Sequence, residues 1–156
     1  MQEIEQITYE TGRSALSDQE ALVARIQQRT GTLLAAHALV ASFLGSTTLR
    51  AQGSSVFTWL AVTALVTGLI VAAVVLAPWP LRFALDVRDV YEIIRDRTSD
   101  RVGSSSAEWL TAVGFAHQEL HNANDPAVQR MSWLSGALAI LMVSQTLAWT
   151  AALLVH

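Results

Sequence analysis

Three long stretches without a formal charge constrain what this chain can become. They cover residues 30–49, 56–77 and 131–155, and each is at least 20 residues long. At about 1.5 Å per residue, a helix of that length spans roughly the 30 Å hydrocarbon core of a bilayer. Only 15% of the residues are charged and 52% are hydrophobic. The sequence therefore predicts an all-α membrane protein with three transmembrane helices.

The residues around the first two stretches predict where these helices begin and end. Ser17 and Glu20 have the spacing of a capping box, so we expect a helix to start at Ser17 and to continue into the first crossing. Residues 1–17 are then a polar N-terminal tail. Residues 51–55 form a short polar turn, which makes the first two crossings an antiparallel hairpin. Pro78 and Pro80 end the second crossing.

Residues 81–130 differ from the rest because they are charged and amphipathic. Apolar residues recur at helical spacing in two patterns, residues 83–94 and 110–120, and a polar linker separates them. Asp125 as N-cap and Pro126 at the first helical position predict a new helix that enters the third crossing. We therefore expect one membrane domain, residues 1–156, with an N-terminal cytoplasmic helix and a two-helix cytoplasmic insertion.

The placement of arginine predicts the orientation of the chain in the membrane. Nine of the ten arginines lie on one side of the three crossings, and Arg50 lies on the other. By the positive-inside rule, the N-terminus and residues 81–130 are cytoplasmic and the C-terminus is outside. The expected location is the cell inner (plasma) membrane, with multiple passes.

Four polar residues lie inside the predicted crossings. His37 is the one ionisable side chain there, and such a group is costly in a membrane and often functional. Gln145 lies near the middle of the third crossing, where it could meet His37 or Thr63 and Thr67. These residues could line a polar path, or they could only make hydrogen bonds between helices.

Several functional classes find no support in the residues. The net charge of −3 argues against a nucleic-acid binder, and the absence of cysteine excludes disulfides and thiolate ligands. His117 and His121 are spaced as zinc ligands could be, but Gln118 stands where the metalloprotease pattern requires Glu, and no third ligand follows. We find no phosphate-binding loop and no nucleophile elbow. No enzyme activity, metal or cofactor is predicted.

The order of segments resembles a known family. A helix with the sequence Arg25-Ile-Gln-Gln-Arg29-Thr-Gly-Thr-Leu-Leu-Ala-Ala leads into the first crossing, and a tight hairpin and an amphipathic insertion follow. A polar His-Gln-Glu-Leu-His-Asn-Ala-Asn stretch then precedes the last crossing. This arrangement, over roughly Ser17 to Val155, is similar to the transmembrane effector domain of the bacterial Pycsar anti-phage systems, and more loosely to the SLATT membrane effectors.

The resemblance implies a membrane effector of anti-phage cyclic-nucleotide signalling that forms homo-oligomers and impairs membrane integrity on activation. The activating ligand would be a cyclic pyrimidine mononucleotide. Its phosphate could meet four cytoplasmic arginines, which could equally serve only topology and pairing with neighbouring carboxylates: Arg88, Arg95, Arg97 and Arg101. Two alternatives remain, a non-enzymatic scaffold or accessory subunit, and a small channel or transporter.

Overall fold

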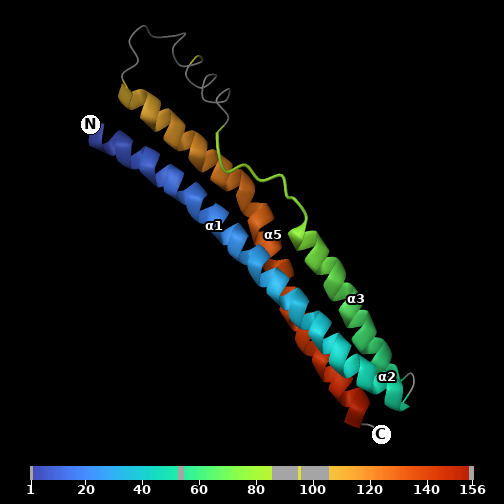
Figure 1. Cartoon of the computed structure of the whole chain (residues 1–156). Coiled ribbons are helices and arrows are strands. Elements are labelled where there is room, and N and C mark those ends of the chain that lie inside the picture. Colours follow the sequence, from blue (N-terminus) through green and yellow to red (C-terminus); the bar gives the residue numbers. More distant parts are fainter. Residues whose placement is uncertain (1, 53–54, 86–94, 96–105, 155–156) are drawn as a thin grey trace. The chain divides into compact units, whose positions relative to one another are not determined.

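The computed structural model describes residues 2–52, 55–85, 95 and 106–154, and the regular elements among them are all helices. Helix α1 comprises Gln2–Val40, and the π-helical segment Ala41–Gly45 continues it into α2, Ser46–Gln52 (Figure 1). Helix α3 comprises Val56–Leu76, and α5 comprises Ser106–Leu154. For the described residues, the all-α prediction is confirmed.

Three helices are long and apolar enough to cross a membrane, judged by length and composition. They fall within Gln6–Thr48, Val56–Leu76 and Trp109–Leu154. Each of the three predicted crossings lies largely inside one of these ranges. The number of membrane-length helices therefore agrees with the sequence, and the differences concern where the helices begin and end.

The chain divides into two compact units. The two-helix unit contains residues 1–23 and 79–129, and the three-helix unit contains residues 24–78 and 130–156. Helices α1 and α5 contribute residues to both units, and α3 belongs to the three-helix unit. The contacts described below lie within one unit or the other.

Small side chains line the buried side of α3 in the three-helix unit. The buried residues follow the intervals of three, four and seven residues that bring side chains to one face of a coiled helix: Thr58, Ala61, Gly68, Ala72 and Val75. Side chains this small let helix backbones approach closely, which is how helices associate in lipid. This face of α3 packs on α1 and α5.

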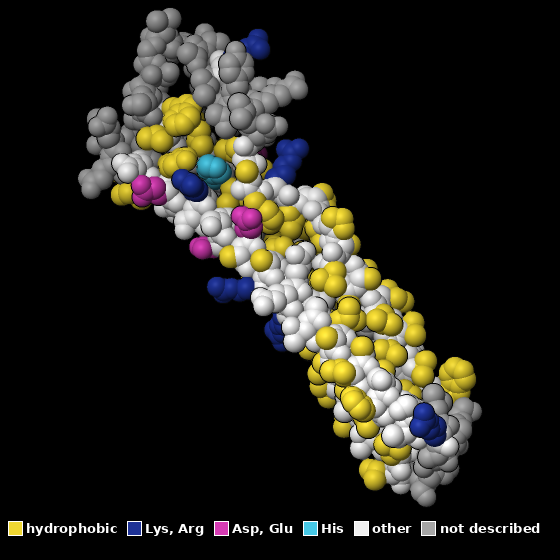
Figure 2. Space-filling view, in the orientation of Figure 1, with side chains coloured by type: hydrophobic (Ala, Val, Ile, Leu, Met, Phe, Trp, Pro, Cys, Tyr) yellow, Lys and Arg dark blue, Asp and Glu magenta, His cyan; other side chains and the backbone are white. Residues whose placement is uncertain are grey.

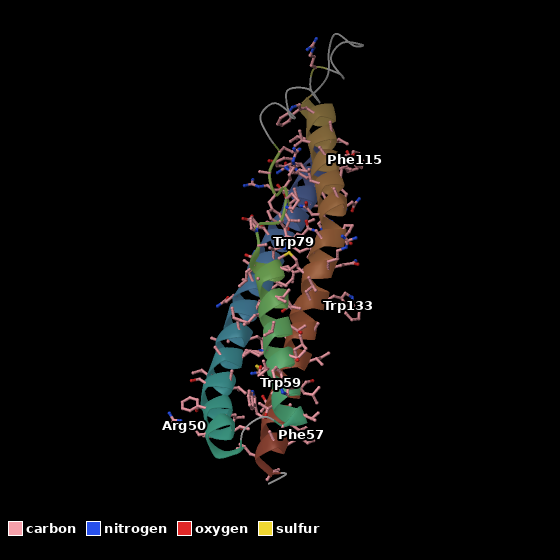
Figure 3. The ribbon with its side chains drawn as sticks, turned by 90° about the vertical axis from the view of Figure 1, so that its right-hand side faces the viewer. Arg50, Phe57, Trp59, Trp79, Phe115 and Trp133 are labelled. Carbon is pink, nitrogen blue, oxygen red and sulfur yellow. The ribbon has the colours of Figure 1, made fainter. Side chains whose placement is uncertain are left out.

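Large apolar side chains cover the outside of the three-helix unit. Trp133 is 81% exposed and Trp59 is 65% exposed, and both project outward from their helices (Figure 3). Hydrophobic side chains spread over the visible surface of this unit (Figure 2). An apolar surface of this extent is typical of contact with lipid or with a partner rather than with water.

The predicted helix start at Ser17 is wrong. Helix α1 begins at Gln2, so Ser17 and Glu20 lie in its interior and the expected polar tail is helical. The helix extends because its N-terminal part has a buried stripe of its own. Leu16, Gln19 and Val23 recur at intervals of three and four residues and are at most 7% exposed. Tertiary packing along this stripe outweighs the local capping signal.

The predicted helix start at Asp125 is also wrong, because α5 runs through Pro126 without ending. A proline inside a helix removes one backbone hydrogen bond, and the helix here tolerates that loss. The polar groups that suggested a cap make other bonds. The Asp125 carboxylate accepts a hydrogen bond from Gln129 at 3.1 Å, and the Asn124 amide bonds to groups outside α5. The second insertion helix and the third crossing are thus one helix.

The ends of the hairpin agree more closely with the sequence. Helix α2 continues to Gln52, so residues 51 and 52 are helical rather than part of the predicted turn. The Ser55 hydroxyl accepts a hydrogen bond from the Thr58 amide at 3.2 Å and caps α3. At the other end, Ala77 is extended, with ψ of 150°, as the residue before a proline should be. Residues 81–85 lack regular structure, and most of the predicted helix after them lies outside the described residues.

Candidate functional site

Buried polar residues occur at several levels in the core of the three-helix unit, among buried apolar residues such as Leu138 and Val75. The polar residues come from all three helices and are at most 4% exposed: Thr30, His37, Thr48, Thr58, Ser135 and Gln145. The Trp149 indole, 2% exposed, adds a further polar atom. We call this set of residues the polar seam. Buried polar groups normally have hydrogen-bond partners.

One pair of hydroxyl groups in the polar seam forms a hydrogen bond between two helices. The Thr30 hydroxyl of α1 lies 3.3 Å from the Ser135 hydroxyl of α5, and the two form a buried hydrogen bond. The Thr48 hydroxyl, by contrast, donates a hydrogen bond to the Leu44 carbonyl, four residues earlier in the same chain segment, at 2.8 Å. The Thr30–Ser135 bond fixes the position of α1 beside α5 at this level of the unit.

His37 lies at the centre of the seam and is 1% exposed. Its ring packs on the backbone of α3 at Gly68, where an added Cβ would lie 2.9 Å from Nε2. Neither ring nitrogen has a hydrogen-bond partner among the described residues. The Leu33 carbonyl, four residues earlier, is near enough to act on the ring electrostatically, but the geometry falls short of a hydrogen bond.

Gln145 and Trp149 continue the seam along α5. Gln145 is fully buried, and neither its amide nitrogen nor its amide oxygen has a partner among the residues described. The Trp149 indole packs on Gly45 of the π-helical segment, and its Nε1 has no partner in the part of the chain that the structure describes. Together with His37, these residues place five unpartnered polar atoms in the core of one small unit.

The contacts of α1 with α5 give the relative level of these residues. Thr30 meets Ser135, and Gly45 meets Trp149, so the two helices run parallel through the three-helix unit. These two contacts place His37 at the same height along the helix axis as residues 141 and 142 of α5. At 1.5 Å per residue, Gln145 lies roughly 5 Å further along the axis than His37. The two side chains therefore occupy neighbouring levels of the seam.

The π-helical segment Ala41–Gly45 keeps both His37 and Gly45 on the buried side of the helix. Buried positions in a coiled helix repeat every seven residues, but these two residues are eight apart. A π-helical turn contains one more residue than an α-helical turn, and it absorbs the extra residue. Ser46 and Thr47 donate hydrogen bonds to the Phe43 carbonyl at 3.1 and 3.2 Å, which helps to satisfy the backbone there.

Two of the four predicted path residues do not reach the seam. Thr63 and Thr67 are exposed, on the side of α3 that faces away from its buried stripe. The Thr63 hydroxyl donates to the Trp59 carbonyl of its own helix at 2.8 Å. The expected contact of these threonines with Gln145 is therefore wrong. The physical reason is that Gly68, Ala61 and Ala72 have the small side chains that the close helix contact requires.

The two-helix unit is held by a backbone contact between α1 and α5. A Cβ added at Gly12 would lie 2.7 Å from the Gly114 carbonyl oxygen, and one added at Gly114 would lie 3.0 Å from the Thr8 carbonyl oxygen. Only glycine allows two helix backbones to come this close. The sequence does contain both glycines, but nothing in the local pattern shows that they face each other across 102 residues.

Asn124 joins three segments of the two-helix unit. Its amide nitrogen donates to the Arg82 carbonyl at 2.8 Å and to the Gln19 side-chain oxygen at 3.2 Å, and its amide oxygen accepts from the Arg82 amide at 3.2 Å. Gln19 in turn donates to the His121 carbonyl at 3.2 Å. Gln19 and Asn124 are each 5% exposed. This network ties the chain that leaves α3 to both α1 and α5.

The histidine pair of the sequence lies in the same unit. The His117 ring packs against Tyr9 of α1, with ring centroids 5.8 Å apart. Burial lowers the pKa of His117 below its ordinary value, and the positive charge of Arg13 lowers it further. Among the described residues, no three His, Asp or Glu side chains come together in a way that could hold a metal ion.

Of the four candidate signal-receiving arginines, Arg88, Arg97 and Arg101 lie outside the described residues. Arg95 is described, and it is exposed. Two features that the sequence did not single out are the Trp149 indole, which has no partner among the residues described, and the network around Asn124. Comparison of the chain with protein-family models, with curated proteins and with solved structures gives no match.

Proposed function

We propose that this chain is a multi-pass protein of the cell inner membrane that changes the permeability of that membrane. The observation that carries the proposal is the set of five buried, unpartnered polar atoms in the membrane-length unit, on His37, Gln145 and Trp149. Each unpartnered group costs about 1–3 kcal/mol, so the closed packing stores free energy that a hydrated arrangement would release. A core built in this way favours a protein that opens over a permanent anchor.

The topology that fits this role has three crossings, a cytoplasmic N-terminus and a C-terminus outside. Arg25, Arg29, Arg82 and Arg130 flank the membrane-length segments on one side, and Arg50 flanks them on the other. The two-helix unit is then cytoplasmic. Exposed Trp133 and Trp59 suit the two interfaces of the bilayer, where amphipathic indoles accumulate.

Self-association is part of the proposal because the resemblance to the Pycsar effectors implies a homo-oligomer. Gly136 supports it, since an added Cβ there would meet nothing within 4 Å and the backbone of α5 is open to a second copy. Trp133 and Ile140, 81% and 69% exposed, flank this position. A close contact between copies at Gly136 would follow the small-residue mode of helix association in lipid.

Activation would come through the cytoplasmic side. The resemblance to Pycsar effectors implies a cyclic pyrimidine mononucleotide as the signal, and the exposed Arg95 is one positive group that could meet its phosphate. Asn124 gives a route from such a signal to the membrane-length helices, because it binds both the segment after α3 and the helices α1 and α5. No enzymatic step belongs to this function.

The test is permeability of liposomes that contain the purified full-length protein. Membrane potential and the release of an entrapped dye are measured with and without cyclic mononucleotides on the face that carries the N-terminus. We expect nucleotide-dependent depolarisation in wild type and in Thr63→Val, an exposed control. Liposomes that stay polarised with every nucleotide, although protease mapping shows correct insertion, would overturn the proposal.

A scaffold that holds a partner at the membrane is the second candidate. The observation in its favour is the exposed apolar surface of the two-helix unit, where Ile4, Ile7 and Phe115 are 68%, 56% and 61% exposed. A water-facing unit with such side chains is suited to bind another protein. Stable co-purification of a second protein, lost in Ile7→Ser with Phe115→Ser and without any permeability change, would favour this reading.

A further inference from the structure

We propose that the polar seam is a path for protons, with His37 as the group that accepts and releases them. This inference rests on the proposed change of permeability and identifies protons as the species that crosses the membrane. It assigns the path to the interior of the three-helix unit of one chain. A wide pore between copies would instead pass dyes and metal ions as well as protons.

The seam has polar groups at successive levels. Thr30 and Ser135 lie at one end, and His37 is seven residues from Thr30, about 10 Å along the helix. Gln145 follows roughly 5 Å further on, and Trp149 lies one turn beyond Gln145. Because a water molecule can bridge a gap like the one between His37 and Gln145, hydration of the seam would join these two groups. Between Thr30 and His37 the core contains the fully buried side chain of Leu138, so the path there requires Leu138 to move aside and about two or three water molecules to enter.

The unpartnered atoms show where that water would bind. Nδ1 and Nε2 of His37, Nε2 and Oε1 of Gln145 and Nε1 of Trp149 are all buried and all lack a partner among the described residues. A buried water usually makes two to four hydrogen bonds to such groups. In the closed packing, the His37 ring contacts Gly68 directly, so this contact blocks the seam. Separation of α1 from α3 by about the width of a water molecule would let water reach the ring.

The charges around His37 explain why protons rather than metal ions are expected. No titratable side chain other than His37 occurs between Arg29 and Arg50 of α1–α2, on α3, or between Arg130 and the end of α5 at Leu154. Without a carboxylate or a ring of carbonyl groups, the seam has nothing to replace the hydration shell of a metal cation. Imidazole instead binds a proton at one nitrogen and releases a proton from the other, so charge and atoms balance without any further reactant.

The absence of a carboxylate also implies that protonation opens the seam. A protonated His37 would be an unpaired cation in a nearly dry core, and burial of such a charge is strongly unfavourable. Hydration of the seam relieves this cost. Proton uptake and opening are therefore coupled, and we expect proton flux to rise as the pH on the N-terminal side falls.

The experiment compares proton flux with leakage of larger solutes in the same liposomes. The full-length protein is reconstituted in liposomes that contain a pH indicator. An outward potassium gradient with valinomycin sets an inside-negative potential that drives protons inward through the protein, and calcein release and sodium entry are followed in parallel. We expect internal acidification without calcein release or sodium entry. His37→Gln should lower the proton flux by roughly tenfold or more, because it removes the titratable group of the seam and keeps its size. Thr63→Val should match wild type.

A second variant keeps the inference testable if His37→Gln folds poorly. Gln145→Met has nearly the shape of glutamine without its donor and acceptor, and it too should lower proton flux. Calcein release or sodium entry at the rate of proton entry would overturn the proton path while it supports the proposed function. Wild-type proton flux in a folded His37→Gln protein would overturn it as well. No flux of any solute at any pH or nucleotide would overturn both the path and the proposed function.

Discussion

The imidazole of His37 rests on the backbone of Gly68, so closely that a methyl group at residue 68 would stand 2.9 Å from Nε2. Gly68→Ala should therefore push α3 away from α1, with a loss of about 1–3 kcal/mol in unfolding free energy from overpacking. Steric-trap or thermal unfolding in detergent measures this change. Gly31→Ala is the matched control, because nothing lies within 4 Å of its Cβ. A Gly68→Ala protein as stable as the control would contradict the contact.

Because the Gln145 amide is buried, its replacement should raise the stability of the protein and lower its proton flux. Replacement with Met removes two unpartnered polar atoms and should raise the unfolding free energy by about 1–3 kcal/mol. The same change should lower the proton flux through liposomes. Thr63→Val, which alters a hydroxyl bonded within its own helix, should change neither quantity. A less stable Gln145→Met protein would imply that the amide has a partner in the native membrane.

The contact of Gly12 with Gly114 should make the two-helix unit sensitive to a single added methyl group. Gly114→Ala places its Cβ 3.0 Å from the Thr8 carbonyl oxygen, and the helix backbones cannot move aside as a flexible side chain could. We expect amide hydrogen exchange to quicken in residues 2–23 and 109–129. Gly31→Ala, where nothing lies within 4 Å of the added Cβ, is the control. Equal exchange in both variants would argue against the close packing of α1 and α5 in this unit.

Asn124→Ala should release the segment that follows α3. The change removes three hydrogen bonds, two of them to the Arg82 backbone, and leaves Gln19 with one partner fewer. A cost of about 1–3 kcal/mol is expected for these buried groups. Limited proteolysis near residue 82 reports the release directly. Asn122→Ala, which removes an exposed bond with Gln118, should leave the cleavage rate unchanged.

The pKa of His117, lowered by burial and by Arg13, gives the two-helix unit a pH dependence. The unfolded chain binds a proton at the ordinary pKa near 6.5 and the folded chain binds it only at lower pH. The stability contribution is thus complete above about pH 6.5 and is lost as the pH falls toward the folded pKa. Unfolding followed from pH 8 to 5 should show this loss in wild type and a smaller one in His117→Gln.

The membrane-length helices were predictable because the length of an apolar run is a property of the local sequence. The membrane-length helices and the break at Pro78 follow from charge-free runs and from proline alone. The capping patterns at Ser17 and Asp125 gave wrong helix starts, because a local pattern carries no information about a partner helix. Residues 2–23 and 106–125 become continuous with the crossings because they pack on each other, through Gly12 and Gly114 and through Gln19 and Asn124.

Two of the four predicted path residues lie where the sequence placed them, in the buried core. His37 and Gln145 stand out because they carry the one imidazole and the one carboxamide of the three charge-free runs, and both are buried in the seam. The expected contribution of Thr63 and Thr67 failed because the inward face of α3 is set by its fit to α1 and α5, which a single helix of uniformly apolar residues does not reveal. The burial of Trp149 was not predictable from its local sequence, because it depends on Gly45, more than 100 residues away.

The π-helical segment Ala41–Gly45 has a consequence for how this sequence can change in length. The interval from His37 to Gly45 is already one residue longer than a regular heptad repeat. Deletion of Ser42 would therefore shorten the interval to seven residues and give an uninterrupted α-helix with both residues still on one face. Most deletions inside a packed helix turn one half of its face away from the core. At this point the chain can lose a residue and keep its packing.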